Sequence, residues 1–167
     1  FQARNDILVD RHAGEHIQSL EQLLADPKIK IGLVRGHANG AYFDERLQAL
    51  AKLQRVEYSA YPSNIFLKLQ AGRIQATLMT AGLYQKELDQ LGLHDQLRII
   101  HVPESDAFSI GLYLSRLTLA SQEIDWLSQH VQAMISDGSL RKLLSRNHGK
   151  ALTAEFYLPA PAPQQPE

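Results

Sequence analysis

The chain of 167 residues contains no cysteine. Without thiols it can form no disulfide, no thiol nucleophile and no cysteine-ligated zinc site. No apolar run approaches the ~18 to 20 residues that a membrane-spanning helix needs. Neither sign of charge dominates, because 17 Lys and Arg residues stand against 18 Asp and Glu residues. This balance argues against nucleic acid as a partner, since phosphate binding usually needs a basic patch.

The segment 29–92 carries the clearest structural pattern. The runs 29–34, 55–59 and 74–79 are typical of strands, and each is followed by apolar residues at helical spacing. Alternation of strand and helix predicts an α/β fold with a central, mostly parallel sheet flanked by helices. Ligands of such sheets bind beyond the carboxyl ends of the strands. The pattern therefore indicates binding of a small ligand before it indicates catalysis.

The rest of the chain predicts four parts. Residues 1–17 form a crossover segment and residues 18–102 an α/β ligand-binding lobe. Residues 103–150 hold a return crossover and two C-terminal helices, with strands expected at 97–102 and 107–114 on either side of a short connection. Residues 151–167 are rich in proline and are expected to be a flexible tail.

The loop 35–40 is the best candidate for a binding site, because it joins a predicted strand to a predicted helix. Free backbone N–H groups at a helix start favour an anionic ligand group. The loop matches neither the Walker nor the dinucleotide-binding glycine pattern. The alternative is a glycine-rich turn in which Asn39 merely caps the helix. The candidate residues in this loop are Arg35, Gly36, His37, Ala38 and Asn39.

Two further candidates follow the other strands of the segment. Tyr61 follows the second strand and Thr80 ends the third, so both are expected at the same edge as the loop. The alternative for Thr80 is simple helix capping. Tyr84 is predicted to be a half-buried core residue.

Other patterns do not assemble a catalytic or metal site. His12 and His16 have the spacing of a metal-binding pair, but Gly14 weakens a helix there and no third ligand is evident. A Ser-x-x-Lys pattern at 139–142 lacks its companion motifs. With no combination of nucleophile, base and orienting group, we predict neither an enzyme nor a cofactor.

Several motifs in order resemble one family. They are the helical run 16–24, the sequence Lys-Ile-Gly-Leu-Val-Arg-Gly at 30–36, Tyr-Pro at 61–62, the segment 69–76, the strand 108–114, and Asp-Gly-Ser-Leu at 137–140 with Asn-His-Gly at 147–149. Together they resemble periplasmic solute-binding proteins of type II, the class that includes amino-acid receptors of ABC importers. The resemblance covers approximately residues 7–149.

The resemblance implies a two-lobed protein that closes on a small polar solute by a hinge, without catalysis, in the periplasm. It implies ABC transporter membrane subunits as partners. It also implies that the chain begins near the crossover into the second lobe, so that most of the first lobe is missing. Two alternatives remain: a ligand-sensing domain of a membrane signalling protein, and a non-catalytic lobe of a cell-wall enzyme fusion.

Two departures from the family qualify these expectations. Its amino-acid receptors place an aspartate where Thr80 stands, and a hydroxyl cannot supply that charge to a ligand ammonium, which argues against an α-amino acid. His37 stands where threonine or serine is common. The missing lobe should also leave strand edges open at 97–102 and 108–114, which predicts a homodimer or a strand-exchanged assembly.

Overall fold

The computed structural model describes residues 2–148 and residue 153. They divide into two compact units. The larger is Arg4–Phe108, and the smaller contains the residues before it and those from Ser109 onward. Each unit is described by itself.

The larger unit is built on a five-stranded sheet of order β4-β3-β5-β2-β6. Its strands are β2 (Asn5–Asp10), β3 (Ile31–Val34), β4 (Val56–Ser59), β5 (Ala76–Thr80) and β6 (Leu97–Ile100). β3 pairs in parallel with β4 and β5, whereas β2 is antiparallel to both β5 and β6. The predicted α/β class with a mostly parallel sheet is confirmed, with β2 as the reversed strand that makes the sheet mixed.

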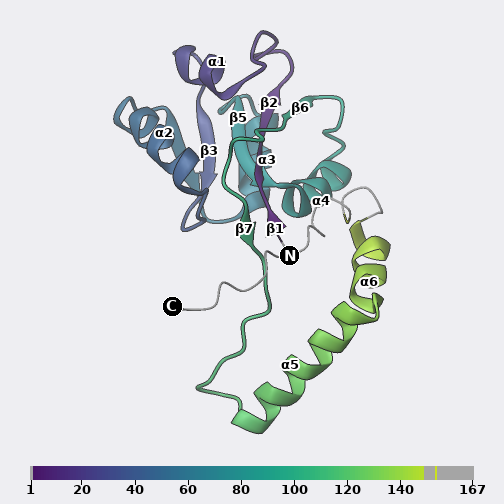
Figure 1. The fold of residues 1–167 in the computed structure, drawn as a ribbon. Coiled ribbons are helices and arrows are strands. Elements are labelled where there is room, and N and C mark those ends of the chain that lie inside the picture. The colour runs from purple at the N-terminus through teal and green to yellow at the C-terminus, as the bar shows by residue number, and fades with distance from the viewer. Residues whose placement is uncertain (1, 149–152, 154–167) are drawn as a thin grey trace. The chain divides into compact units, whose positions relative to one another are not determined.

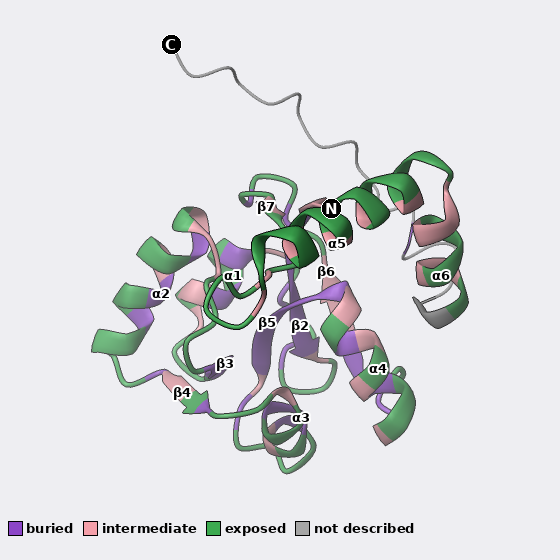
Figure 2. Ribbon diagram, turned by 90° about the horizontal axis from the view of Figure 1, so that it is seen from below, coloured by how far each residue is buried: buried purple, intermediate pink, exposed green. Residues whose placement is uncertain are grey.

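Helices cover both faces of the sheet (Figure 1). α1 (Leu20–Ala25) and α2 (Ala41–Lys52) cover one face, and α3 (Pro62–Gln70) and α4 (Ala81–Leu91) cover the other. Figure 2 shows buried central strands and exposed outer surfaces on α2 and α4. α2, α3 and α4 follow β3, β4 and β5, as the apolar spacing after each predicted strand indicates.

The core beneath α1 and α2 follows the two-residue alternation of the strands. Ile7 and Val9 of β2 are fully buried in this core together with side chains of both helices, while Leu8 between them is buried on the opposite face. The helix contributions to this core are Leu20, Leu23, Phe43, Leu47 and Leu50.

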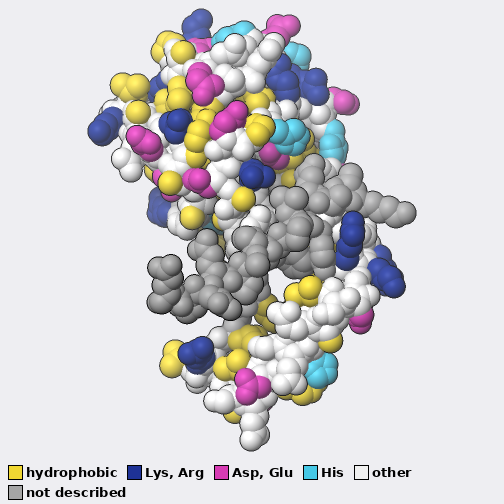
Figure 3. Space-filling view, in the orientation of Figure 1, with side chains coloured by type: hydrophobic (Ala, Val, Ile, Leu, Met, Phe, Trp, Pro, Cys, Tyr) yellow, Lys and Arg dark blue, Asp and Glu magenta, His cyan; other side chains and the backbone are white. Residues whose placement is uncertain are grey.

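The surface of this unit carries charges of both signs. On the face seen in Figure 3, basic and acidic side chains are interspersed rather than separated by sign. This matches the near-neutral composition of the chain.

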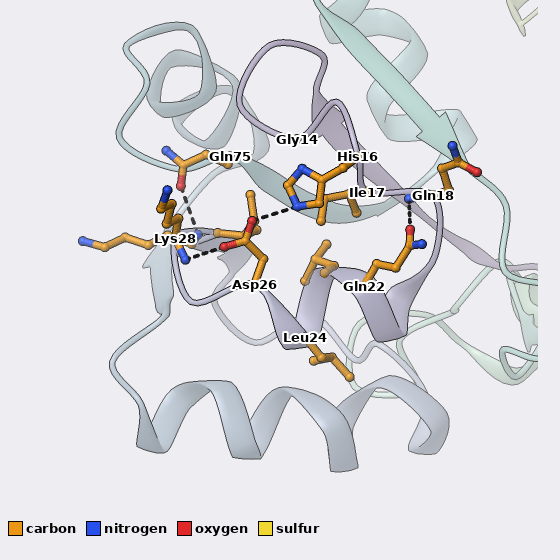
Figure 4. Close-up of polar contacts among 12 residues, drawn as sticks. Gly14, His16, Ile17, Gln18, Gln22, Leu24, Asp26, Lys28 and Gln75 are labelled. Carbon is orange, nitrogen blue, oxygen red and sulfur yellow. Dashed lines mark hydrogen bonds and ion pairs between the residues drawn. The ribbon is translucent and has the colours of Figure 1, made fainter.

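Polar contacts close the sheet edge where β3 and β5 begin (Figure 4). His16 Nε2 lies 2.9 Å from Asp26 Oδ2, and the backbone N–H of Lys28 donates to Asp26 Oδ1 at 2.8 Å. Gln75 Oε1 accepts from the backbone N–H of Lys30 at 3.0 Å. His16 therefore has a structural partner in Asp26.

Arg55 is buried beside this edge and satisfies the end of α1. Its guanidinium donates to the carbonyls of Leu23, Leu24 and Ile29 at 2.8, 2.8 and 2.9 Å. The last carbonyls of a helix have no partner within the helix, so these bonds replace missing ones. Burial lowers the pKa of Arg55 from its ordinary value, and the nearby Asp26 opposes this.

The smaller unit contains β1 (Gln2–Ala3), α5 (Ser121–Ser136) and α6 (Ser139–His148), and β7 (Phe108–Ser109) spans the boundary between the units. β1 and β7 form a two-stranded sheet. The strand predicted at 107–114 is wrong beyond Ser109, because residues 110–115 have no regular structure and β1 offers only a two-residue partner.

None of the helices within residues 2–148 has the length and apolar character to cross a membrane. The proline-rich tail predicted at 151–167 lies, apart from Thr153, outside the described residues.

The strand pairing bears on the premise of the predicted homodimer. β6 pairs with β2 at the end of the five-stranded sheet and β7 pairs with β1, so among the described residues each segment has one neighbour and one open edge. No finding supports self-association of this chain.

Candidate functional site

The carboxyl ends of three parallel strands meet at one edge of the sheet. β3 leads into the loop 35–40, β4 leads into Tyr61, and β5 ends at Thr80. Because β2 runs in the opposite direction, its first residue, Asn5, lies at this same edge and pairs with Thr80. The edge therefore combines residues from the start and the middle of the unit.

The β3–α2 loop is exposed and its backbone is anchored. The backbone N–H of Arg35 donates to the Ser59 carbonyl at 2.8 Å, which extends the pairing of β3 with β4. The backbone N–H of His37 donates to the Val34 carbonyl at 3.2 Å and closes a turn. Within the described chain, the side chains of Arg35 and His37 make no hydrogen bond or ion pair, so both are available to a ligand.

Glycine is required at two positions of this loop. Gly36 and Gly40 have φ values of 79° and 88°, which side chains with a Cβ rarely adopt. Gly40 is the N-cap residue of α2 and, as a glycine, provides no side-chain capping hydrogen bond. Ala38 is exposed between them.

Asn39 braces the loop instead of capping α2. Its carbonyl accepts a hydrogen bond from Asn5 Nδ2 at 3.3 Å, and its own Nδ2 donates to Asp44 Oδ1 at 3.4 Å. The alternative that Asn39 is the N-cap is wrong, because Gly40 holds that position. Asn5 thus connects the loop with Thr80.

Thr80 and Tyr61 occupy different depths of the edge. Thr80 is 8% exposed and precedes α4, but its hydroxyl makes no capping hydrogen bond. Tyr61 is 67% exposed and precedes α3. Since β3 stands between β4 and β5, Tyr61 is separated from Thr80 by one strand. The structure joins the loop and Thr80 through Asn5, and it leaves Tyr61 at the periphery.

A carboxylate from a distant segment lies at the start of α2. Asp106 Oδ2 accepts a hydrogen bond from the backbone N–H of Tyr42 at 2.9 Å. Local sequence patterns do not indicate this contact, because Asp106 lies in the short connection between the segments predicted as strands at 97–102 and 107–114. Its separation from Tyr42 by 64 residues hides it from any local pattern.

A second polar group missed by the sequence reasoning lies on the α4 face. Asp6 is 6% exposed, and its two oxygens lie 2.8 Å from Tyr84 Oη and 2.8 Å from His101 Nδ1. Tyr84 is 3% exposed, so it is more buried than predicted. The His101 side chain is 64% exposed. The one available signal was the polar pair Asn5–Asp6 before an apolar strand.

The contact with Asp6 orients the His101 ring and leaves its Nε2 for a hydrogen bond to another group. A neutral imidazole that donates its Nδ1 proton to Asp6 keeps Nε2 as a hydrogen-bond acceptor, while a protonated ring makes Nε2 a donor. β6 runs in the same direction as β5, so its end at Ile100 brings His101 to the edge that carries the loops. The ring is oriented and accessible there.

A hollow of about 310 Å³ lies next to the start of α2 on the α1 side. It is lined by Gln18, Ser19, Leu20, Glu21, Tyr42 and the segment 100–104. Among residues 2–148, no three His, Asp or Glu side chains are grouped to hold a metal ion.

No protein-family model and no curated protein matches the chain. Several solved structures match the chain. An ancestral arginine-binding protein bound to glutamine is 20% identical with a TM-score of 0.63, and the match covers 89% of this chain and 61% of that one. An ancestral amino acid-binding protein, described as a precursor of cyclohexadienyl dehydratase, is 18% identical with a TM-score of 0.62, covering 87% and 58%. The substrate-binding protein of an amino acid ABC transporter is 16% identical with a TM-score of 0.58, covering 87% and 59%.

These matches establish the fold of the chain as that of type II solute-binding proteins. The fold expected from the sequence motifs is confirmed. The chain spans 58% to 61% of the length of these structures.

Proposed function

We propose that this chain binds a small polar solute at the edge formed by the β3–α2 loop, Asn5 and Thr80, outside the cytoplasmic membrane, as part of ABC-type uptake. The observation that carries the proposal is the exposed loop braced by Asn5 against the end of β5. Its Arg35 and His37 side chains make no hydrogen bond or ion pair with other described residues. A rigid backbone with available polar side chains loses little entropy on binding.

The predicted residues take distinct roles in this proposal. Gly36 and Ala38 let the ligand approach the backbone, while Arg35, His37 and Asn39 supply hydrogen bonds. The Thr80 hydroxyl, which makes no capping bond, faces the buried part of the ligand. Tyr61 covers the ligand from the exposed side.

The solved structures that share this fold support a binding role. The solved structures of this fold include an arginine-binding protein and the substrate-binding protein of an amino acid ABC transporter. The chain spans only about three fifths of those structures, so closure of a second lobe over this edge and contact with transporter membrane subunits are parts of the proposal rather than of the structure.

In this proposal the edge binds the solute without catalysing a reaction. Among the described residues, no side chain makes a hydrogen bond with the Thr80 hydroxyl that would activate it as a nucleophile. One of the similar structures is described as a precursor of cyclohexadienyl dehydratase, so catalysis is the alternative function, and turnover of the solute would be the evidence for it.

The test is native mass spectrometry of the intact protein, followed by calorimetric titration with the compound whose mass is found. We expect a bound solute that is lost in the double variant His37→Ala with Asn39→Ala. The matched control is His12→Ala, an exposed histidine near the opposite edge. Retention of the solute by the double variant would overturn the assigned site, and turnover of the solute would overturn the binding-only role.

A further inference from the structure

The start of α2 is occupied by the protein's own carboxylate. Asp106 Oδ2 accepts from the Tyr42 backbone N–H at 2.9 Å, in the first turn of a 12-residue helix. The first turn of a helix carries a partial positive charge and unsatisfied N–H groups. One of the N–H groups at the helix start, where the sequence predicts a ligand anion, is therefore occupied by Asp106.

Asp106 is held in place by the turn that precedes it. Ser105 is 3% exposed, and both its backbone N–H and its hydroxyl donate to the Val102 carbonyl, at 3.0 and 2.7 Å. The Ser105 carbonyl accepts from Arg4 Nε at 3.1 Å. These bonds fix the backbone next to Asp106, so the carboxylate does not depend on its single contact with Tyr42 for its position.

The loop is shaped to receive this side chain. A Cβ added to Gly40 would lie 3.3 Å from Asp106 Cβ and 3.4 Å from Asp106 Oδ2. Both distances are at or below the close end of ordinary carbon contacts. The Gly40 backbone therefore packs directly on the carboxylate.

Asp106 keeps the capacity to bind a further partner. It is exposed, and within residues 2–148 its Oδ1 makes no hydrogen bond. A carboxylate has about four acceptor positions, of which Tyr42 uses one. The free oxygen is thus presented beside the loop that includes His37 and Asn39.

We propose that Asp106 determines the charge class of the solute. Resting on the proposed function of this edge, the inference is that the group of the solute nearest Gly40 and the start of α2 is a cation or a neutral hydrogen-bond donor, and that Asp106 excludes a carboxylate there. Arg35, at the other end of the loop, faces an acceptor group of the solute. A second anion would have to displace Asp106 or approach it at short range, and like charges at that separation repel.

The test compares two probes by calorimetric titration of the intact protein. Agmatine carries a guanidinium and an ammonium without a carboxylate, and succinate carries carboxylates without a cation. We expect the unsubstituted protein to bind agmatine and not succinate. Asp106→Asn should weaken agmatine by about 3- to 10-fold and strengthen succinate, in keeping with the usual effect of one charge at a helix start. Asparagine caps helices as well as aspartate does, so the variant should fold.

The matched control is Glu45→Gln, which removes the same charge from the first turns of α2. Glu45 is exposed and makes no hydrogen bond or ion pair within the described chain. Its variant should leave the ratio of the two affinities unchanged. Equal ratios in the Asp106 and Glu45 variants, or a preference of the unsubstituted protein for succinate, would overturn the role of Asp106.

The same experiment separates this inference from the proposed function. Binding of either probe that is lost in the His37 and Asn39 double variant but unchanged in Asp106→Asn would leave the edge site standing and remove the role of Asp106. Absence of binding of both probes to the unsubstituted protein and to Asp106→Asn, with normal thermal unfolding, would count against both.

Discussion

Tyr84 Oη donates a hydrogen bond to Asp6 Oδ2 at 2.8 Å and thereby joins the first turn of α4 to β2. Both residues are more than nine-tenths buried. A buried carboxylate is stable only when its oxygens are hydrogen-bonded. The contact therefore accounts for a charged residue inside a strand that is otherwise apolar.

Substitution Tyr84→Phe should destabilise the protein by about 1 to 3 kcal/mol, because it removes one of the two partners of a buried charged group. The measurement is urea unfolding followed by circular dichroism. Tyr58→Phe is the control, since Tyr58 is 51% exposed and its hydroxyl makes no hydrogen bond within the described residues. Equal stability of the two variants would show that Asp6 does not depend on the tyrosine.

Substitution Arg55→Met should cost about 3 kcal/mol or more. The variant leaves the carbonyls of Leu23, Leu24 and Ile29 without their donors in a buried place. The control is Arg73→Met, an exposed arginine whose side chain has no partner in the described chain, with an expected change within about 0.5 kcal/mol. Chemical denaturation measures both. A loss below about 1 kcal/mol for Arg55→Met would mean that water replaces the guanidinium.

Lowering the pH should reduce the contribution of Asp26 to the stability of the folded protein. The backbone N–H of Lys28 is the first cause that lowers the pKa of Asp26, and His16 adds to it, while desolvation opposes both. A carboxyl whose pKa is lower in the folded state stabilises the fold above its unfolded pKa, and this stabilisation disappears as the pH falls through the folded value. The difference in unfolding free energy between the unsubstituted protein and Asp26→Asn should therefore be larger at about pH 5 than at about pH 2.

This pH dependence is measured by urea unfolding across that range. Asp95→Asn serves as the control, because Asp95 is exposed and makes no hydrogen bond or ion pair in the part of the chain described. A constant difference between Asp26→Asn and the unsubstituted protein from pH 5 to pH 2 would contradict the assignment.

Alanine at Gly40 should be more harmful than alanine at Gly36. Both glycines have positive φ, so each substitution should cost about 1 to 2 kcal/mol from the backbone. Only at Gly40 does the new Cβ meet a neighbour, Asp106, while the space around Gly36 is open. Thermal unfolding of the two variants tests this. Equal losses would show that Asp106 moves away without cost.

The sequence predicted the helices and strands of the α/β unit because their signals are local. Ser19 Oγ accepts a hydrogen bond from the Gln22 backbone N–H at 3.3 Å, so Ser19 is the N-cap of α1, a position that serine favours. The three parallel strands and the helices between them follow from apolar spacing alone. The prediction at 107–114 failed because a strand needs a partner, and the apolar pattern cannot report how long that partner is.

The candidate site was predictable only in its loop. Residues 35–40 carry a signal in their glycines and in their place between strand and helix. Asn5, His101 and Asp106 come from other segments, and they reach the edge through the antiparallel pairing of β2 and through the turn at Ser105. Sheet order decides those neighbours, and nothing in the spacing of the residues encodes the order.

The hydrogen bond from Arg4 to the Ser105 carbonyl has a mechanical consequence. The chain comes into the α/β unit at Arg4 and leaves it shortly after Ser105, so this bond fastens its two ends to each other. Separating the entering strand from the leaving one requires this bond to break, so the two ends of the unit are held as a pair by one guanidinium–carbonyl contact.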